Sequence, residues 1–373
     1  MLYNNKTIAY EMIFVISIIL FIIPINFAQA SNYLVHPDEI ITYTPVSIKH
    51  NSSEEKLFFD GMNYFKMKQF DNAIKAFDQL TKESPNCAEA YAYLSQSKYY
   101  KNISSTHPIA DPSILQLDDK AIELEPNNPL FHCFRALHSP IYYVVEYDLE
   151  KALALNPKLS YAYYCKGIVS EIKKDDQAAI DNFTKAIDLE PSDDIYYMDR
   201  GDIYYQLDDY AKAMEDYKMV LKLNPNNSDA YFSIGDINYS LENYDEALNG
   251  YSKAIELDPN YTDAYYSRGM IYLKKGNYYK AANECSKSIA LDNECADAYY
   301  WRGWSMYELG HYTEAIHDFS YAINYYEEPE PDAYRGRALA YKSLGDNEMY
   351  HININLYNKY NNSNFAYLNP LWD

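Results

Sequence analysis

The chain has 373 residues, of which 48% are hydrophobic and 23% are charged. This composition supports a folded core and excludes a chain that is disordered throughout. The formal net charge of −22 repels phosphate backbones and so argues against nucleic acid as a partner. The same charge is compatible with basic partners and with simple solubility.

Residues 1–30 have the pattern of a targeting segment. Lys6 precedes an apolar run over residues 12–27, and Ala28-Gln29-Ala30 has the small-x-small pattern that signal peptidase cleaves. The run is shorter than the roughly 20 residues that a membrane span needs. We therefore expect a cleaved signal peptide, with Ser31 as the new terminus, and export to a periplasmic, extracellular or secretory space. Retention of the segment as a membrane anchor is the alternative.

Four series of residues return along the chain with one period of 34. The triplet Asp-Ala-Tyr begins at Asp229, Asp263 and Asp297, and again at Asp332. The other three series are formed by glycine, alanine and proline, at Gly167, Gly201, Gly235, Gly269 and Gly303, at Ala179, Ala213, Ala247, Ala281 and Ala315, and at Pro157, Pro191, Pro225 and Pro259. Four series with a shared period indicate a repeat architecture.

Each period predicts two helices joined by a short turn. In residues 228–261, the first half has Tyr231 and Ile234 at helical spacing, and the second half has Ala247 and Tyr251 on one face. The proline ends the repeat because a helix does not continue back through it. The small residues allow the helices to approach closely. A further set of glycines, Gly276, Gly310 and Gly345, is expected to end first helices in left-handed turns.

These residues resemble the tetratricopeptide repeat, a helix–turn–helix of 34 residues. One repeat has the pattern at Tyr163, Gly167, Ala179, Phe183, Ala186 and Pro191, and another has it at Tyr197, Gly201, Tyr204, Ala213, Tyr217 and Pro225. The resemblance implies an all-α, right-handed superhelical solenoid of antiparallel helix pairs. It is specific for the fold and weakly specific for function.

We expect about nine repeats, of which three are degenerate. Six match well and begin near residues 54, 160, 194, 228, 262 and 296, while the stretches 88–127, 128–159 and 331–363 depart from the pattern. The expected organisation is a linker over 31–53, N-terminal repeats over 54–159, five regular repeats over 160–329, and a capping repeat with a tail over 330–373. The tail residues Phe365 to Trp372 are expected to fold back on the cap.

The resemblance implies a concave wall lined by the first helix of each pair. Side chains that follow the packing aromatic are expected to face this wall as protein-binding residues, namely Tyr164, Met198, Asp202, Tyr205, Phe232, Asp236, Tyr239, Tyr266, Met270, Tyr300, Trp304 and Tyr307, together with Ile168. They predict an aromatic, acidic groove for a peptide or partner segment with basic and apolar residues. Trp304 is the first choice among them because tryptophan is rare in this chain.

Structural explanations remain open for the same residues. Asp229, Asp263 and Asp297 suit the first turn of a helix, where a negative charge favours the dipole. The aromatic stripe is also explained by packing in a chain with 44 tyrosines. Family members that grip acidic tails use basic side chains on this wall, and here those places hold aromatic, Met and Asp residues. The recurring Arg200, Arg268 and Arg302 are expected to form structural ion pairs. 

The sequence contains no glycine-rich phosphate loop, HExxH motif, calcium loop or GxSxG motif. We therefore expect no enzyme activity, no cofactor and no metal. The five cysteines are expected to be small core residues, for the most part. Among the Asn-x-Ser/Thr triplets, which include Asn182 and Asn260, we expect only Asn51 and Asn102 to be exposed enough for modification.

Two functions stay open at this point. The first is a non-catalytic scaffold or adaptor that binds a partner segment in the groove. The alternative is a structural assembly factor of an extracytoplasmic or membrane-associated complex, acting through its outer face. A membrane is involved only if residues 12–27 are retained as an anchor.

Overall fold

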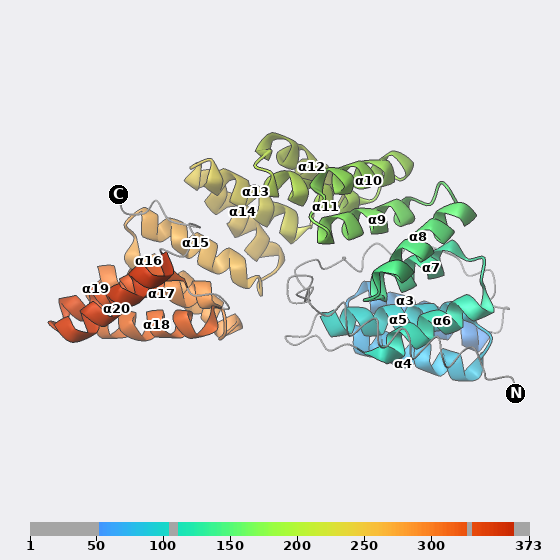
Figure 1. Cartoon of the computed structure of the whole chain (residues 1–373), viewed down its shortest axis with the longest axis horizontal. Helices are drawn as coiled ribbons and strands as arrows, with labels where there is room; N and C mark the ends of the chain where they lie inside the picture. Colours follow the sequence, from blue (N-terminus) through green and yellow to red (C-terminus); the bar gives the residue numbers. More distant parts are fainter. Residues whose placement is uncertain (1–51, 104–110, 327–329, 362–373) are drawn as a thin grey trace, which may run out of the picture. The chain divides into compact units, whose positions relative to one another are not determined.

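A computed structural model describes residues 52–103, 111–326 and 330–361 of the chain. Within these residues the regular elements are 18 α-helices without any strand, which confirms the all-α repeat fold (Figure 1). In chain order the helices are α3 (Ser52–Lys66), α4 (Phe70–Glu83), α5 (Ala88–Ile103), α6 (Pro112–Leu124), α7 (Pro129–His138), α8 (Tyr142–Leu155), α9 (Ser160–Ile172), α10 (Asp176–Leu189), α11 (Asp194–Gln206), α12 (Tyr210–Leu223), α13 (Ser228–Ser240), α14 (Tyr244–Leu257), α15 (Thr262–Lys274), α16 (Tyr278–Leu291), α17 (Ala296–Glu308), α18 (Tyr312–Tyr325), α19 (Pro331–Ser343) and α20 (Asn347–Asn361).

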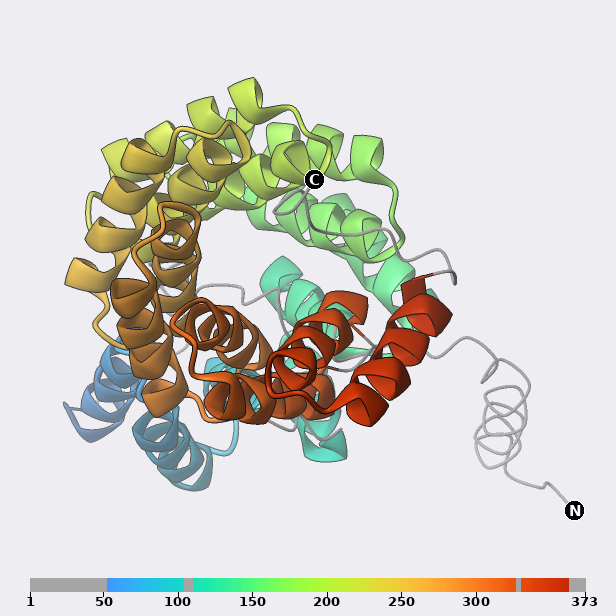
Figure 2. The ribbon, with the colours of Figure 1, turned by 90° about the vertical axis from the view of Figure 1, so that its left-hand side faces the viewer.

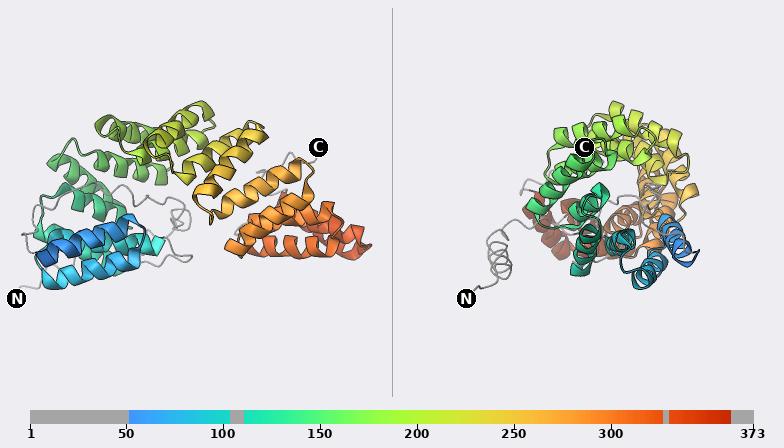
Figure 3. Two further views of the ribbon diagram at one scale, coloured as in Figure 1. Left: turned by 180° about the vertical axis from the view of Figure 1, so that it is seen from behind. Right: turned by 90° about the vertical axis from the view of Figure 1, so that its right-hand side faces the viewer.

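The helices form consecutive antiparallel pairs, and they divide into two compact units. Unit 1 comprises residues 1–196 and unit 2 comprises residues 197–373, with the boundary inside α11. In unit 1, α3 and α4 lie side by side as the blue pair of Figure 3. In unit 2, α17 with α18 and α19 with α20 form the orange and red pairs of Figure 2. The boundary at residue 196 separates two compactly packed units. The boundary that the sequence predicts at residue 160 is a different feature, because it marks where the regular repeats begin.

Small residues let the two helices of a pair approach closely, as the periodicity predicts. A Cβ atom on Gly235 of α13 would lie 2.7 Å from the ring of Tyr251 on α14, which is closer than real contacts allow. The same relation joins Gly303 of α17 to Phe319 of α18, at 3.0 Å. Each glycine therefore provides the space that the aromatic ring of the second helix fills.

The turn inside most pairs uses a left-handed residue. Gly276, Gly310 and Gly345 have φ angles of 72°, 79° and 83°, which confirms the turn role predicted for them. Other pairs place a residue with a side chain in this conformation, for example Glu242 at φ 61°. Such residues carry backbone strain that glycine avoids.

A recurring arginine ties neighbouring pairs together. Arg302 of α17 donates two hydrogen bonds to Asp318 of α18, at 2.8 and 2.7 Å, and a third to Ser286 of α16 at 3.3 Å. Arg268 reaches Glu284 and Ser252 in the same way. The structural ion-pair role predicted for the arginine series is therefore confirmed.

The degenerate repeats still form helix pairs. Helix α7 has 10 residues where α9 has 13, yet it pairs with α8 as the other first helices pair with their partners. The expected signal segment, most of the linker and the C-terminal tail lie outside the described residues. No helix in the described part of the chain has the length and apolar character needed to cross a bilayer.

Candidate functional site

The first helices of unit 2 share one face of the stack. Helix α17 contacts both α15 and α19, which are the first helices of the neighbouring pairs. Among the described residues, second helices make no comparable contact with one another. At α15, α17 and α19 the first helices therefore approach one another more closely than the second helices do, and we take the face that the first helices share as the inner side of the stack. We call this face the acidic wall and define it by Asp202, Asp236, Asp263, Asp297 and Glu330.

Tyrosine hydroxyls hold several of these carboxylates. Tyr217 of α12 donates a hydrogen bond of 2.6 Å to Asp202 of α11, and Tyr251 of α14 donates one of 2.7 Å to Asp236 of α13. These two pairs are equivalent in successive repeats. A tyrosine hydroxyl orients a carboxylate but supplies no positive charge to pair with it.

The carboxylates of the wall influence one another. Burial, together with the charges of Asp263 and Asp202, raises the pKa of Asp236 to about 7 against the hydrogen bond from Tyr251. Burial, together with the charges of Asp332 and Asp297, likewise raises the pKa of Glu330 to about 7. Like charges that lie close together in a partly dehydrated surface favour a cation between them.

Aromatic rings lie on the same helix pairs as the acidic wall. Phe232 stacks on Tyr261 with ring centroids 5.0 Å apart, and Tyr205 contacts Tyr210 at 5.6 Å. The predicted residues that are half-buried, and so present part of their surface, are Asp202, Tyr205, Phe232, Asp236, Tyr239, Tyr266, Met270 and Tyr307. Their role in binding stays a prediction.

Four predicted groove residues are buried instead, so the expectation that they line an open surface is wrong. Tyr164, Met198, Tyr300 and Trp304 are at most 6% exposed, and Ile168 is also buried. Tyr164 belongs to unit 1, where its ring lies 5.8 Å from Phe183.

Trp304 shows the physical reason. Its ring packs 5.3 Å from Phe319 on α18, edge to face, and it is only 3% exposed. Where the second helix offers Phe, as at Phe183 and Phe319, a large first-helix ring closes onto it. Where the second helix offers Tyr, as at Tyr217 and Tyr251, the hydroxyl needs an acceptor and an aspartate faces it. The wall is therefore polar in some repeats and closed by rings in others.

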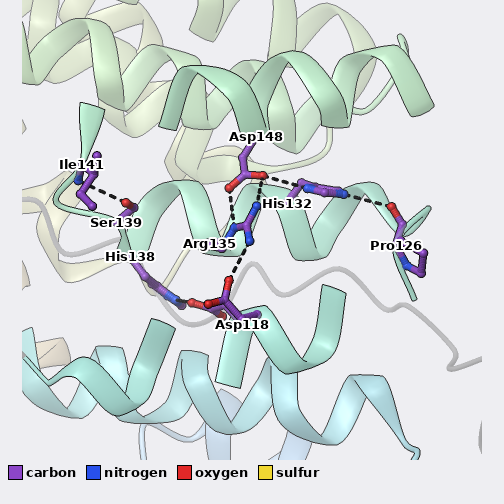
Figure 4. A network of polar contacts seen from close by, with 9 residues as sticks. Asp118, Pro126, His132, Arg135, His138, Ser139, Ile141 and Asp148 are labelled. Carbon is purple, nitrogen blue, oxygen red and sulfur yellow. Dashed lines mark hydrogen bonds and ion pairs between the residues drawn. The ribbon is translucent and has the colours of Figure 1, made fainter. Parts of the chain in front are cut away.

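Sequence reasoning missed a buried polar network in unit 1 (Figure 4). Asp148 of α8 is fully buried and accepts hydrogen bonds from His132 at 2.9 Å and from Arg135 at 2.7 and 2.8 Å. The second ring nitrogen of His132 lies 3.1 Å from the carbonyl oxygen of Pro126. Burial alone raises the pKa of Asp148, but the hydrogen bonds from His132 and Arg135 outweigh it and hold this pKa below its usual value.

A second histidine extends this network toward α6. His138 lies 2.7 Å from Asp118, which also accepts a hydrogen bond from Ser95 of α5. The side chains of Asp118, His132 and Asp148 are buried, and the contacts of the network join helices α5, α6, α7 and α8. The network is therefore structural. One sequence signal relates this network to the regular repeats, namely an arginine followed by an acidic residue at a similar distance along the chain. The separation is 13 residues from Arg135 to Asp148 and 16 residues from Arg302 to Asp318.

The side chains that could bind a metal ion are those of His, Asp and Glu, together with the cysteines. In the described ranges no group of three or more His, Cys, Asp or Glu side chains has an arrangement suited to a metal ion. All five cysteines are free thiols; four are buried and Cys295 is half-buried, in line with their predicted packing role. The arrangement on the acidic wall can attract and orient cations.

Comparison with known families agrees with this geometry. A model described as TPR repeat matches residues 201–241 and 235–276, and models described as tetratricopeptide repeat match 262–295, 296–329 and 61–86. The chain is a tetratricopeptide repeat protein.

Individual relatives cover the chain to different extents. The human mitochondrial import receptor subunit TOM70 is 27% identical over 123 residues, which is 32% of this chain and 19% of the relative. The chain thus spans about a fifth of the length of the curated relatives it matches. The crystal structure of yeast Tom70 has a TM-score of 0.54 at 18% identity, covering 82% of this chain and 68% of that one. The APC/C hetero-tetramer Cut9-Hcn1 has a TM-score of 0.56 at 12% identity, covering 84% and 74%. These structures share the fold.

Proposed function

We propose that the chain is a non-catalytic protein-binding scaffold, and that the acidic wall of unit 2 binds a partner segment with basic and apolar residues. The observation that carries the proposal is the position of Asp236 between Asp202 and Asp263. Within the described residues, neither Asp236 nor Asp263 forms an ion pair with a Lys, Arg or His side chain of this chain.

A basic partner complements this arrangement in two ways. A Lys or Arg side chain placed beside Asp236 relieves the repulsion that raises the pKa of its carboxyl. The half-buried rings of Phe232, Tyr239 and Tyr266 offer aromatic faces next to the carboxylates. Such faces bind apolar side chains and also attract cations. The two features together favour a segment in which basic and apolar residues alternate.

The relatives support the class of function. One relative is named a mitochondrial import receptor subunit, and a receptor role agrees with the recognition of a partner proposed here. The likeness covers about a third of this chain, so it supports protein recognition in general and says nothing of a particular partner.

The test compares fluorescent peptides of matched length that combine leucine with lysine or with glutamate. We expect the lysine peptide to bind and the glutamate peptide to remain free. The double variant Asp236→Asn, Asp263→Asn should weaken binding about tenfold, since each exposed charge pair contributes up to about 1 kcal/mol. The matched control is Glu246→Gln on the exposed face of α14. Equal binding of both peptides, or equal loss in the control, would rule the proposal out.

A second function, assembly through the outer face, is favoured by a patch on α8. Ile141, Tyr142, Tyr143 and Tyr147 are 42%, 56%, 70% and 55% exposed, an unusual run of large apolar side chains. If this patch joins subunits of a complex, Tyr143→Ser with Tyr147→Ser should abolish assembly while peptide binding survives. If the acidic wall is the functional surface, these two changes leave partner capture intact.

We further propose that the chain acts outside the cytoplasm, exported through residues 1–30. The composition of that segment supports the proposal. Mass spectrometry of the protein from its own host should find Ser31 as the first residue. An intact Met1 on a membrane-bound protein would favour the anchored alternative.

A further inference from the structure

Two asparagines occupy equivalent exposed turns of successive repeats. Asn226 lies between α12 and α13, and Asn260 lies between α14 and α15. Each begins an Asn-x-Ser/Thr triplet, completed by Ser228 and by Thr262. This triplet is the acceptor sequence for asparagine-linked glycans in exported proteins. The sequence alone predicts sufficient exposure only at Asn51 and Asn102. The structure has Asn102 half-buried and Asn260 exposed, and Asn51 lies outside the described residues.

The turn leaves both amide side chains available. The backbone N–H of Asn226 donates to the side chain of Asn224 at 3.3 Å, and that of Asn260 donates to Asp258 at 2.9 Å. The turn is thus closed by the residue two positions earlier, and its stability does not depend on the asparagine amide. Asn226 and Asn260 are both exposed, and each directly follows a proline.

The triplets that begin at Asn182 and Asn238, within helices, differ in this respect. The amide of Asn182 on α10 donates to the carbonyl oxygen of Ala178 at 2.7 Å, and that of Asn238 on α13 donates to Ile234 at 2.8 Å. Both side chains are half-buried, and the residue after Asn182 is the core ring Phe183. A bulky sugar at either position would have to displace these contacts.

We propose that Asn226 and Asn260 are N-glycosylation sites of the exported chain, an inference that rests on the proposed export. In the reaction, the amide nitrogen of asparagine forms a bond to the first sugar of a lipid pyrophosphate-linked oligosaccharide. The bond from that sugar to the pyrophosphate breaks, the lipid pyrophosphate leaves, and the amide loses one proton to the transferring enzyme.

The position of the two sites relates them to the acidic wall. Asp229 and Asp263 follow Asn226 and Asn260 by three residues, within the first turn of α13 and α15. Glycans on the two asparagines therefore stand at the end of the wall where these first helices begin. A bound partner segment must pass between them or enter from the opposite end of the helices.

Neighbouring repeats supply matched variants. The equivalent positions are Ser192 and Glu294, which are also exposed, and the N–H of Glu294 donates to Asp292 at 2.9 Å as in the other turns. Asn226→Ser and Asn260→Glu therefore introduce residues that this turn already accepts. Thr262→Ala removes the acceptor hydroxyl and keeps the asparagine, with Ala296 as its precedent in the next repeat.

The experiment expresses the full chain in eukaryotic secretory cells, once with its own N-terminus and once with residues 1–30 replaced by a strong signal peptide. Peptide mass spectrometry after N-glycosidase should find aspartate at positions 226 and 260, and no conversion at Asn182. Asn226→Ser and Asn260→Glu should each remove one glycan, and Thr262→Ala should act as Asn260→Glu does.

A negative result distinguishes an error in the proposed glycosylation sites from an error in the proposed export. If the chain with the strong signal carries no glycan at Asn226 or Asn260, the site proposal is wrong. If only that chain is modified, the natural N-terminus does not deliver the protein to the lumen, and the inference fails together with the proposed export.

Discussion

Arg302 of α17 and Asp318 of α18 are joined by two parallel hydrogen bonds of 2.8 and 2.7 Å, the bidentate geometry in which the planar fork of a guanidinium matches the two oxygens of a carboxylate. Asp318 is 4% exposed, so its carboxylate is largely shielded from water and hydrogen-bonds to this partner instead. The third hydrogen bond from Arg302, to Ser286 of α16, connects the pair to the repeat before it. One side chain thus holds three helices in register.

Removing the acceptor should destabilise unit 2. We expect Asp318→Ala to lower the free energy of unfolding by about 3 kcal/mol, because a partly buried guanidinium is left without its carboxylate. Urea denaturation followed by tryptophan fluorescence measures this, since Trp301 and Trp304 are buried in the same unit. The exposed pair of Lys253 and Glu256 is the control, and Glu256→Gln should leave the midpoint unchanged. Equal effects of the two changes would contradict the clamp.

The last helix pair offers the opposite test. Arg337 donates to the neutral amide of Asn353 at 2.8 Å, and burial lowers the pKa of this arginine. Asn353→Asp gives the position the carboxylate that other repeats have and should stabilise unit 2 by about 1 kcal/mol, after loss of the amide hydrogen bond to Met349. A rise in the urea midpoint is the expected result. A fall would show that the amide contact outweighs the ion pair.

The left-handed turns predict a pair of opposite changes. Gly276→Ala should destabilise unit 2 by about 1 kcal/mol, because φ at this position is 72°. Glu242→Gly should stabilise the same unit by about 0.5 kcal/mol, since relief of strain exceeds the entropy that glycine adds to the unfolded chain. Thermal unfolding of both variants beside the wild type measures the two shifts. Shifts of the same sign would refute the explanation.

In unit 1 the buried carboxylate of Asp148 should be indispensable. We expect Asp148→Asn to cost about 3 kcal/mol, because Arg135 and His132 then lack their charged acceptor. Hydrogen exchange in peptides from α7 and α8 reports the loss locally. Asp119, which also pairs with Arg135 but is 63% exposed, is the control, and Asp119→Asn should have a much smaller effect. Because the folded pKa of Asp148 is lowered, its contribution is present above about pH 4 and disappears as the pH falls through the folded value.

The acidic wall predicts the reverse dependence in unit 2. The pKa of Asp236 is raised to about 7 in the folded state, so between about pH 4 and pH 7 the folded chain binds more protons than the unfolded chain. The stability of unit 2 should therefore rise when the pH is lowered from 7.5 to 5, as measured by urea denaturation with tryptophan fluorescence. Asp236→Asn should reduce this rise, and an unchanged dependence in that variant would show that other groups cause it.

The repeat and its close contacts could be predicted from residues alone. The glycine series that includes Gly235 and Gly303 predicts close helix packing, and the structure has those positions against aromatic rings. The arginine series predicts ion pairs, because its members stand one residue before the glycines that face the second helix. It is harder to predict from the sequence which side chains of the first helices face the inner side of the stack and which are buried. Trp304 occupies a position of the first-helix face, yet Phe319 on the next helix draws its ring into the core.

The network around Asp148 lay beyond sequence reasoning for a related reason. His132, Asp148 and the carbonyl of Pro126 come from different elements, and their meeting depends on the short α7. No periodic pattern marks them, because the repeat that contains them has lost its consensus residues.

The sequence by itself determined the helix pairs, the turns and the family, because a period of 34 residues with fixed small and aromatic positions permits one local packing. Only the tertiary structure decided which side chains of the first helices remain accessible. That outcome depends on the ring or hydroxyl that a second helix presents to each of them, as Tyr251 does to Asp236 and Phe319 does to Trp304. The exposure of a side chain depends on which residue of another helix it contacts. The repeat pattern gives only the spacing of residues along the chain and does not specify these contacts.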